Sequence, residues 1–476
     1  MLCIKASLVA DTGVEMNTQV KEQRIAVDMT EGPLLGKMIA FTIPVILTGT
    51  LQLLFNATDL VMVGRFAGSA ALAGVGCCGA LINLIIQAFL GLSTGAGVIA
   101  SQSIGAHKNE DLERIINTSF ITSVIAGIAV GLFGFFAAEP MLTMMYTPTD
   151  VLPEATSYMQ AYFVGMPAML IYNYLAAILR AAGDTKRPLA FLTIAGVANV
   201  GLNFIMLKFF GLGAMGVGIA TSASQYISAV LMVIYFLSGK SVCRLTGIKP
   251  TGKILSRIVM IGLPAGVQGS LFSLSNVLIQ STVNGYGTVV VAGSSAAANI
   301  EGFLNNAVYS VHQASINFVG QNIGAGKYDR IKRIVFLSLA IVIVLMLVMS
   351  AATLIFGEEL LNIYEPGKVD VIAAGMERLY ITTTTYVLLG IMDILCALVR
   401  GMGLAVQPML VSLIGSCALR IVWIYTVCPL YPTNIQVLYV SYPITWTITA
   451  LAHTAFFVYY YKKFKRRNNN GIKELS

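Results

Sequence analysis

The chain has 476 residues, of which 57% are hydrophobic and 11% are charged, and its mean hydropathy is +0.79. Soluble globular domains carry about a quarter charged residues, so this composition excludes an ordinary soluble protein and indicates a polytopic membrane protein. A net charge of +8 is compatible with a nucleic-acid partner, but the distribution of the basic residues argues against one.

Twelve apolar stretches follow one another along the chain. In chain order they cover residues 38–64, 71–98, 114–138, 156–180, 188–209, 214–238, 256–284, 289–319, 334–357, 375–399, 406–428 and 435–461. Each is long enough for one membrane-spanning helix, which needs ~20 apolar residues. Barrel strands of ~10 residues are excluded by the length of the stretches. The sequence therefore predicts an all-α membrane protein with twelve transmembrane helices.

The segments between and around these stretches predict the domain boundaries. We expect a cytoplasmic N-terminal tail over residues 1–36, a first six-helix lobe over 37–238, a cytoplasmic inter-lobe linker over 239–255, a second six-helix lobe over 256–461 and a basic cytoplasmic tail over 462–476. The apolar patch at the start of the chain is too short for the core of a signal peptide, and Asp11 interrupts it.

The basic residues are unevenly divided between the two sides on which the loops alternate. One side holds most of them, and the other holds only Arg65, Lys208, Lys368 and Arg378. An excess of Lys and Arg marks cytoplasmic loops, so we expect a cell-membrane protein with both termini in the cytoplasm. The basic charge then serves topology and contact with anionic lipids, and we expect no nucleic-acid partner.

The two halves of the chain resemble each other in sequence. The segment "TIPVILTGTLQLLFN" matches "GLPAGVQGSLFSLSN", "SQSIGAHK" matches "GQNIGAGK", and "LRAAGDTKRP" matches "VRGMGLAVQP". Asn56 thereby corresponds to Asn276, whereas Asp59 corresponds to Ile279. Each half contains an even number of helices, so the repeats run parallel, about an axis along the membrane normal. Two such lobes favour a rocking carrier with its substrate site between them.

The first predicted helix contains a polar stripe that ends on an acid. Four of its residues fall within ~80° of one another on a helical wheel: Thr48, Gln52, Asn56 and Asp59. A charge that faces lipid costs at least ~2.5–3.5 kcal/mol, so we expect the stripe to face the protein interior. Asp59 is a candidate for ion coupling or a structural acid bonded to its neighbours. Pro44 removes a backbone hydrogen bond and is a candidate hinge.

The acids of the second half lie in other helices. Glu301 is near the middle of the eighth predicted helix, and Asn305 and His312 fall within ~40° of it on the wheel. A partly buried carboxylate near a histidine can exchange a proton near neutral pH, so this face is a candidate proton relay. Asp393 lies in the tenth helix, where the first half has Asn173. A paired structural charge is the alternative for both acids.

These segments, with "TEGPLLGKMIAFTIPVILTGTLQLLFNATDLVMVGRFAG" and "ALAGVG", resemble the multidrug and toxic compound extrusion (MATE) transporter family in their order, spacing and duplication. The resemblance extends from about Thr30 to the last helix. It implies two six-helix lobes that form a V around a central cavity. It also implies a proton- or sodium-driven exporter of small organic, often cationic, compounds.

The resemblance assigns roles to some polar residues and leaves others open. Asp59 matches the helix-1 acid that the family uses in cation coupling, and Asp393 matches a helix-10 acid of some branches. The fifth helix carries Asn199 and Asn203 where one branch has a second acid. Where another branch has a glutamate, the seventh helix offers only Gln268, Asn276 and Gln280. The coupling ion therefore stays open between H⁺ and a Na⁺ near Asp59.

The predicted function is secondary active antiport, in which organic cations or drugs leave in exchange for H⁺ or Na⁺ by alternating access between the lobes. We expect a functional monomer in the lipid bilayer, without a cofactor or a resident metal. The seven cysteines are scattered and show no metal-ligand spacing.

The sequence disfavours three alternatives to antiport. A flippase or exporter of a lipid-linked or endogenous metabolite would use the same architecture but would favour a basic ring in the cavity. Arg420 is the one cation that the sequence places at membrane depth, and we expect it to pair with an acid or with carbonyl groups. An enzyme is disfavoured because the sequence contains no H-E-x-x-H motif. A passive channel is equally disfavoured.

Overall fold

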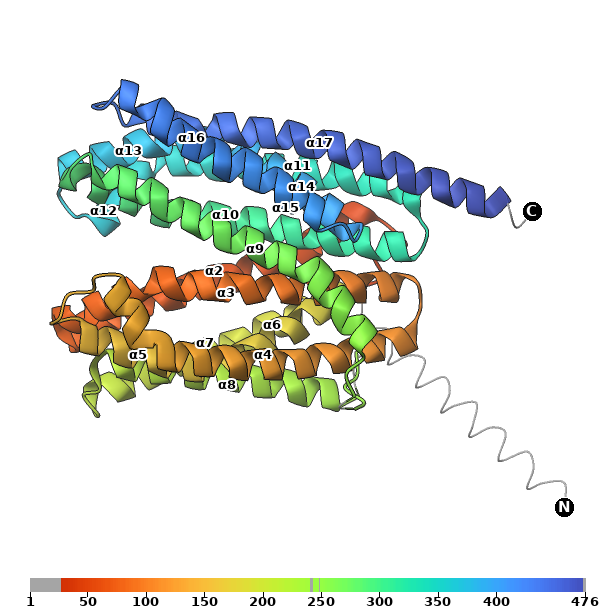
Figure 1. Ribbon diagram of the computed structural model, residues 1–476, viewed down its shortest axis with the longest axis horizontal. Helices are drawn as coiled ribbons and strands as arrows, with labels where there is room; N and C mark the ends of the chain where they lie inside the picture. The colour runs from red at the N-terminus through yellow and green to blue at the C-terminus, as the bar shows by residue number, and fades with distance from the viewer. Residues whose placement is uncertain (1–26, 240–242, 248, 474–476) are drawn as a thin grey trace, which may run out of the picture.

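The computed structural model of the protein describes residues 27–239, 243–247 and 249–473. Helices make up most of these residues, and none of the described residues forms a strand. Figure 1 shows the helices in two lobes that lie side by side, with α2 to α8 in one and α9 to α17 in the other.

The first lobe consists of α2 (Leu34–Phe66), α3 (Gly68–Gly105), α4 (Asn109–Met144), α5 (Leu152–Val164), α6 (Met166–Ala181), α7 (Lys186–Lys208) and α8 (Gly213–Leu237). The second lobe consists of α9 (Gly252–Asn284), α10 (Thr288–Gly324), α11 (Tyr328–Ile355), α12 (Gly357–Tyr364), α13 (Val369–Thr384), α14 (Tyr386–Gly401), α15 (Val406–Ser412), the π-helical turn η1 (Leu413–Ala418), α16 (Leu419–Thr426), η2 (Cys428–Leu430) and α17 (Gln436–Lys473).

The helices confirm the predicted membrane fold. Within the described residues, eight helical stretches are long and apolar enough to cross a membrane, and ten are when each of two bent pairs counts as one span. The two remaining predicted spans coincide with α10 and α17. Each predicted apolar stretch thus lies on a long helix or on a run of joined helical segments, and the chain is a multi-pass, all-α membrane protein of two repeated lobes.

Two spans are bent at equivalent points of the repeat. The pair α5 and α6 and the pair α13 and α14 are each bent by 47°. The first bend lies at Gly165, where a Cβ atom would come within 2.6 Å of the side-chain oxygens of Ser222 and Gln225 on α8. The second lies at Thr385, whose hydroxyl donates to the carbonyl oxygens of Ile381 and Thr382. The sequence analysis does not anticipate these bends.

The lobes touch through backbone contact between α3 and α9. A Cβ atom at Gly91 would lie 2.0 Å from the backbone nitrogen of Gly266, and one at Gly95 would lie 2.4 Å from the carbonyl oxygen of Ile258. Real Cβ atoms do not come so close to backbone atoms, so glycine permits this crossing of helices. The crossing lies toward the end of the bundle that carries Lys37, Lys186, Lys327 and Lys465, which we call the basic end.

The predicted N-terminal and C-terminal tails are only partly covered by the described residues. Residues 1–26 and 474–476 of the predicted tails lie outside the described residues, as do 240–242 and 248 of the predicted linker. Residues 27–32 pack between the two lobes at the basic end, and α2 begins at Leu34. At the other terminus, α17 continues to Lys473, through most of the predicted basic tail (Figure 1).

Candidate functional site

An aspartate and two asparagines meet inside the first lobe. Asp59 on α2 is 9% exposed, and its Oδ1 accepts a hydrogen bond of 2.5 Å from Nδ2 of Asn203 on α7. The same amide donates to Oδ1 of Asn199 at 3.3 Å, one turn earlier on α7. A spacing of four residues puts both asparagines on one helix face, and the packing of α7 against α2 turns that face toward Asp59.

More oxygen atoms surround the Asp59 carboxylate. Thr221 on α8 and the phenols of Tyr158 and Tyr162 on α5 interact electrostatically with it. Oδ1 of Asn203 is buried without a hydrogen-bond partner among the described residues. Such oxygen atoms suit a hard cation, and a carboxylate in an apolar bundle also takes up a proton. The chemistry of this first-lobe site therefore fits either ion.

The other residues of the predicted stripe lie apart from this cluster. Gln52 and Asn56 are exposed on α2, and Thr48 donates its hydroxyl hydrogen to the carbonyl oxygen of Pro44 at 2.7 Å. That carbonyl lies one turn before Thr48 in a helix that continues unbroken through Pro44. Only Asp59 of the stripe therefore joins the buried polar cluster, and the hinge at Pro44 stays a prediction.

Two further asparagines of the predicted site are also outside the buried cluster. Asn276 on α9 is exposed. Asn173 on α6 donates from Nδ2 to the carbonyl oxygen of Met169, four residues earlier in its own helix. Neither side chain therefore contacts Asp59 in this structure, and their place in a cavity stays a prediction.

Glu301 forms a buried ion pair in the second lobe. Its two carboxylate oxygens accept hydrogen bonds of 3.0 and 2.7 Å from Nε and Nη2 of Arg378 on α13. Thr382 donates to the same carboxylate at 2.7 Å, and Arg378 also donates to Ser294 at 2.7 Å. The sequence analysis assigned Arg378 to a loop, whereas the structure places it inside α13, where it is 7% exposed.

His312 pairs with Asp393. Nδ1 of His312 on α10 lies 2.9 Å from Oδ2 of Asp393 on α14, and the His312 ring stacks on Tyr309. Asn305, which lies between Glu301 and His312 on α10, donates to the hydroxyl of Tyr386 at 3.0 Å and to the backbone carbonyl oxygen of Glu301 at 3.1 Å. The predicted face of Glu301, Asn305 and His312 is therefore divided among three different partners, and the proton relay through Glu301 stays a prediction.

The sequence analysis assigns no role to His453, which is fully buried on α17. Its Nε2 lies 3.0 Å from the hydroxyl of Ser412, directly before the π-helical turn η1, and its Nδ1 has no partner among the described residues. His312, Asp393 and Arg400 are the ionisable groups that interact with it electrostatically. Because these residues are far apart in the sequence, no local pattern reveals the cluster.

Two more arginines are buried in the second lobe. Arg400 is 6% exposed and donates from Nη2 to Oε1 of Gln268 on α9 at 2.8 Å. Arg420 is also 6% exposed, donates from Nη2 to Thr445 at 3.0 Å and lies 4.1 Å from the ring centroid of Tyr442. Among the described residues, no carboxylate lies within ion-pair distance of Arg420, so of the two predicted kinds of partner, an acid or carbonyl groups, the acid is not observed.

The ionisable groups do not form a transition-metal site within the described part of the chain, where no three His, Cys, Asp or Glu side chains cluster to hold a metal ion. Both lobes instead contain an intramembrane acid that has no Lys or Arg within ion-pair distance among the described residues. The first-lobe acid is Asp59 among amides and hydroxyls. The second-lobe acid is Asp393 beside imidazole groups.

Comparisons of the sequence with known proteins agree with this architecture. A family model described as MatE matches residues 44–205 and 264–426, one match in each half of the repeat. The probable multidrug resistance protein YpnP of Bacillus subtilis is 28% identical over 397 residues, which cover 83% of this chain and 88% of that protein. The probable multidrug resistance protein YoeA of the same organism is 24% identical, with coverage of 90% and 94%.

Solved structures share the fold. One is described as the outward-facing conformation of a multidrug resistance MATE family transporter of the MOP superfamily; it has a TM-score of 0.86 and 19% identity, and the match covers 93% of this chain and 99% of that one. A MOP superfamily transporter from Pyrococcus furiosus has a TM-score of 0.87 at 19% identity, with the same coverage.

Proposed function

The chain belongs to the MatE family of multidrug efflux transporters, and from this premise we propose that it is a secondary active antiporter that exports organic cations in exchange for H⁺ or Na⁺. Members of this family are membrane transporters and not enzymes, act on small molecules, couple transport to ions and need no cofactor. For this chain we propose four further points: ion exchange as the mechanism, a cationic cargo, a monomeric state, and the coupling residues named below.

The observation that carries the proposal is the buried Asp59 in the first lobe. It has no cationic side chain within ion-pair distance among the described residues, in contrast to Glu301, which Arg378 neutralises. A carboxylate inside a membrane protein is costly unless it binds a proton, a metal ion or a cationic ligand. Asp59 therefore binds the coupling ion when the organic cation is absent, and the two compete.

The contacts between the lobes support alternating access. Ser101 on α3 bonds Asn317 on α10 at 2.8 Å, and Asn306 on α10 donates to the carbonyl oxygen of Ile46 on α2 at 2.9 Å. With the crossing at Gly91 and Gly266, these contacts lie from the basic end to about the middle of the four helices. Rocking of the lobes that opens the basic end must break them, and the opposite ends then approach.

Coupling follows when the ion and the cargo prefer different states of the lobes. An ion that binds Asp59 from the outer side displaces the cationic cargo, and the loaded protein then reverts to the state that opens toward the cytoplasm. The charge distribution supports a cytoplasmic basic end, with both termini there and the chain in the cell membrane.

One observation favours a second candidate, the export of a lipid-linked or endogenous metabolite that carries an anionic group. Arg420 is a buried cation without a carboxylate partner in the described residues, and its Nε has no hydrogen-bond partner. A carboxylate or phosphate on the cargo would supply the missing charge. Competition of anionic compounds with a fluorescent cation, compared in wild type and in Arg420→Met, separates this candidate from export of simple cations.

The test of the main proposal is transport by the purified protein in proteoliposomes, with a pH gradient or a sodium gradient imposed separately. Uphill accumulation of a fluorescent organic cation under one of the gradients is the expected result. Movement of the cation only down its own gradient, whatever the ion gradient, would show a passive channel or facilitator and overturn the proposal.

A further inference from the structure

We propose that Asp393, His312 and His453 form a proton-binding site in the second lobe, and that this site takes H⁺ in preference to Na⁺. The inference rests on the proposed ion-coupled function and names the ion of the second lobe. His453 is the new member, because the cluster exists only through the packing of α17 against α14 and of α14 against α10.

The cluster brings together one carboxylate and two imidazoles from three different helices. His312 approaches Asp393 from α10 at 2.9 Å, and His453 interacts with Asp393 from α17. Arg400 and Cys396 are the other ionisable groups near Asp393, and both lie on its own helix, α14. The helix α11 also packs against α14 and contributes no ionisable group to this set in the described residues.

Asp393, His312 and His453 differ in how far they are exposed to solvent. The Asp393 side chain is 24% exposed, whereas the His312 and His453 residues are 4% and 0% exposed. Asp393 therefore connects the cluster to the surface of the lobe, and the imidazoles lie behind it. Nδ1 of His453 is a buried nitrogen without a partner among the described residues, so it offers a second place for a proton beside the one between His312 and Asp393.

The chemistry of the ligands favours protons over sodium. Na⁺ is a hard cation and takes several oxygen ligands, whereas this cluster offers one carboxylate and imidazole nitrogens. Uptake of a proton forms one N–H bond and converts a neutral imidazole into an imidazolium ion beside a carboxylate, and release reverses this step. The oxygen-rich site around Asp59 lacks such a bias.

The chain contains three histidines, which makes a direct test feasible. Nitrogen-15 histidine labelling of the full-length protein in nanodiscs gives the ring-nitrogen signals of three imidazoles, and the exposed His107 is the internal reference. We expect the imidazole signals of His312 and His453 to change together with pH, as those of a coupled pair, and saturating Na⁺ to leave these changes unaltered. Asp393→Asn should move both curves and leave that of His107 in place.

Independent titration of His312 and His453, or curves that Na⁺ shifts as strongly as it would a sodium site, would overturn the inference. His453→Gln provides a second variant if Asp393→Asn does not fold, since it should shift the His312 curve. In proteoliposomes, His453→Gln should lower transport driven by a pH gradient by about tenfold, while His107→Asn keeps wild-type transport. If the wild type transports nothing under any gradient, the proposed function fails, and the imidazole titrations still decide the proton site.

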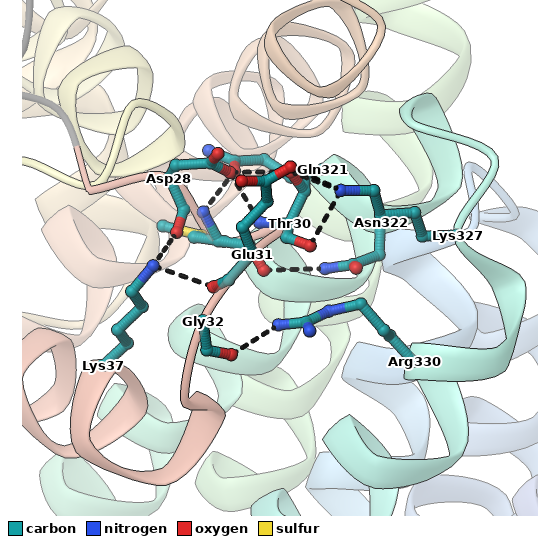
Figure 2. Close-up of polar contacts among 10 residues, drawn as sticks. Asp28, Thr30, Glu31, Gly32, Lys37, Gln321, Asn322, Lys327 and Arg330 are labelled. Atoms are coloured by element: carbon teal, nitrogen blue, oxygen red, sulfur yellow. Dashed lines mark hydrogen bonds and ion pairs between the residues drawn. The ribbon is translucent and has the colours of Figure 1, made fainter.

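A separate observation at the basic end carries a second inference. Residues Val27–Gly32, which we call the strap, are continuous with α2 of the first lobe and lie across the second lobe (Figure 2). Met29 is fully buried, its backbone nitrogen donates to Oε1 of Gln321 at 3.0 Å, and its carbonyl oxygen accepts from Nδ2 of Asn322 at 3.1 Å. The second lobe therefore holds the strap by its backbone.

Charged side chains reinforce the strap on both sides. Lys327 donates to the carbonyl oxygen of Thr30 at 3.1 Å and to Glu31 at 3.2 Å, and Arg330 donates to the carbonyl oxygen of Gly32 at 3.1 Å. From the first lobe, Lys37 donates to the carbonyl oxygens of Asp28 and Glu31 (Figure 2). The strap thus joins the two lobes through bonds that persist only while the basic end is closed.

Of the two repeat-related contacts between the lobes at the basic end, the strap covers only one. Gln321 donates to the carbonyl oxygen of Ala181, and its counterpart Gln102 donates to that of Gly401, the counterpart of Ala181. A Cβ atom at Gly183 would meet Val27 of the strap at 2.7 Å, whereas at the equivalent Gly403 it would meet the side chain of Gln102. The paired glutamines close the basic end symmetrically, and the strap adds to one of them.

We infer that the strap is a latch, which stabilises the state with the basic end closed and slows its opening. Lys327→Ala removes the strap contacts of Lys327 with Thr30 and Glu31, and Lys108→Ala is the matched control, since Lys108 is the exposed repeat counterpart of Lys327. Hydrogen exchange of the full-length protein should become about tenfold faster in Lys327→Ala at the strap and also at the crossing of α3 and α9, which the strap does not touch.

Faster exchange at the strap alone, with the α3–α9 crossing as protected as in Lys108→Ala, would show a local tie and overturn the latch. Asn322→Ala removes a different contact and should reproduce the effect if Lys327→Ala is poorly folded. This readout needs no transported compound, so it remains decisive if the proposed antiport fails.

Discussion

Arg378 holds both carboxylate oxygens of Glu301 in a buried, two-pronged ion pair, and each side chain is 8% exposed. This pair joins α13 to α10 within the second lobe. Because Glu301 is paired with a fixed cation, it differs from Asp59, whose hydrogen-bonding neighbours among the described residues are an amide and a hydroxyl.

The pair should matter for stability more than for coupling. Glu301→Gln leaves the Arg378 charge buried without its partner, which costs ~3–5 kcal/mol for a pair of this kind. We expect a lower midpoint of thermal unfolding in detergent for Glu301→Gln and recovery of most of the loss in Glu301→Met with Arg378→Met. If Glu301→Gln keeps wild-type stability and abolishes ion-driven transport, Glu301 belongs to the coupling site instead.

A second carboxylate beside Asp59 should change the ion preference of the first lobe. Asn203→Asp replaces the amide that donates to Asp59 with another acid, in a site already rich in oxygen atoms. Two neighbouring carboxylates attract a cation more strongly than one, so sodium should stimulate transport in this variant at lower concentration. The matched variant Asn203→Ser should not gain this stimulation. Equal sodium dependence of the two variants would show that Asn203 lies outside the ion site.

The crossing of the lobes should tolerate no side chain at Gly91. In Gly91→Ala the Cβ atom would meet the backbone of Gly266 at 2.0 Å, so α3 and α9 must separate. Overpacking of this kind costs ~1–3 kcal/mol, and this cost destabilises the state in which the basic end is closed. We expect faster hydrogen exchange along this crossing and slower transport. Gly79→Ala on the same helix is the control, because its Cβ atom would meet nothing within 4 Å.

The strap should not respond to pH near neutrality. Burial would raise the pKa of Asp28, but hydrogen bonds from Thr30 and the charges of Lys37 and Lys327 outweigh it and lower the pKa below its ordinary value. A lowered pKa contributes stability above the ordinary Asp value of ~3.9, and the contribution is lost as the pH falls through the lowered pKa. Strap protection, corrected for intrinsic exchange, should therefore be constant from about pH 5 to pH 8. Loosening within this window would contradict the assignment.

The architecture was predictable because it depends on patterns that are local or repeated. Length and hydropathy place the spans, and the alignment of Pro44 with Pro264 reveals the two lobes. The buried partners were not predictable in the same way. Arg378 interrupts an apolar run next to Glu377, so the sequence resembles a loop, and only the fold brings it to Glu301.

Some residues of the candidate site were predictable from local sequence patterns, and others were not. The amphipathic pattern of α2 identified Asp59 as an interior acid, and its resemblance to the family pointed to Asn199 and Asn203. Gln52 and Asn56 share its stripe but are exposed, because a helical wheel does not specify where along a helix the neighbouring helices pack. His453 was missed because its partners lie on two other helices, and a single histidine in an apolar run has no local signature.

The role of Asp59 in coupling is tested most directly by Asp59→Asn in proteoliposomes. The asparagine keeps the size and hydrogen-bonding capacity of the side chain but cannot bind a proton or attract a cation by charge. Uphill transport of a fluorescent organic cation should fall by at least about tenfold. The control Asp150→Asn, at an exposed loop residue, should match wild type. Undiminished ion-driven accumulation in Asp59→Asn would contradict the account.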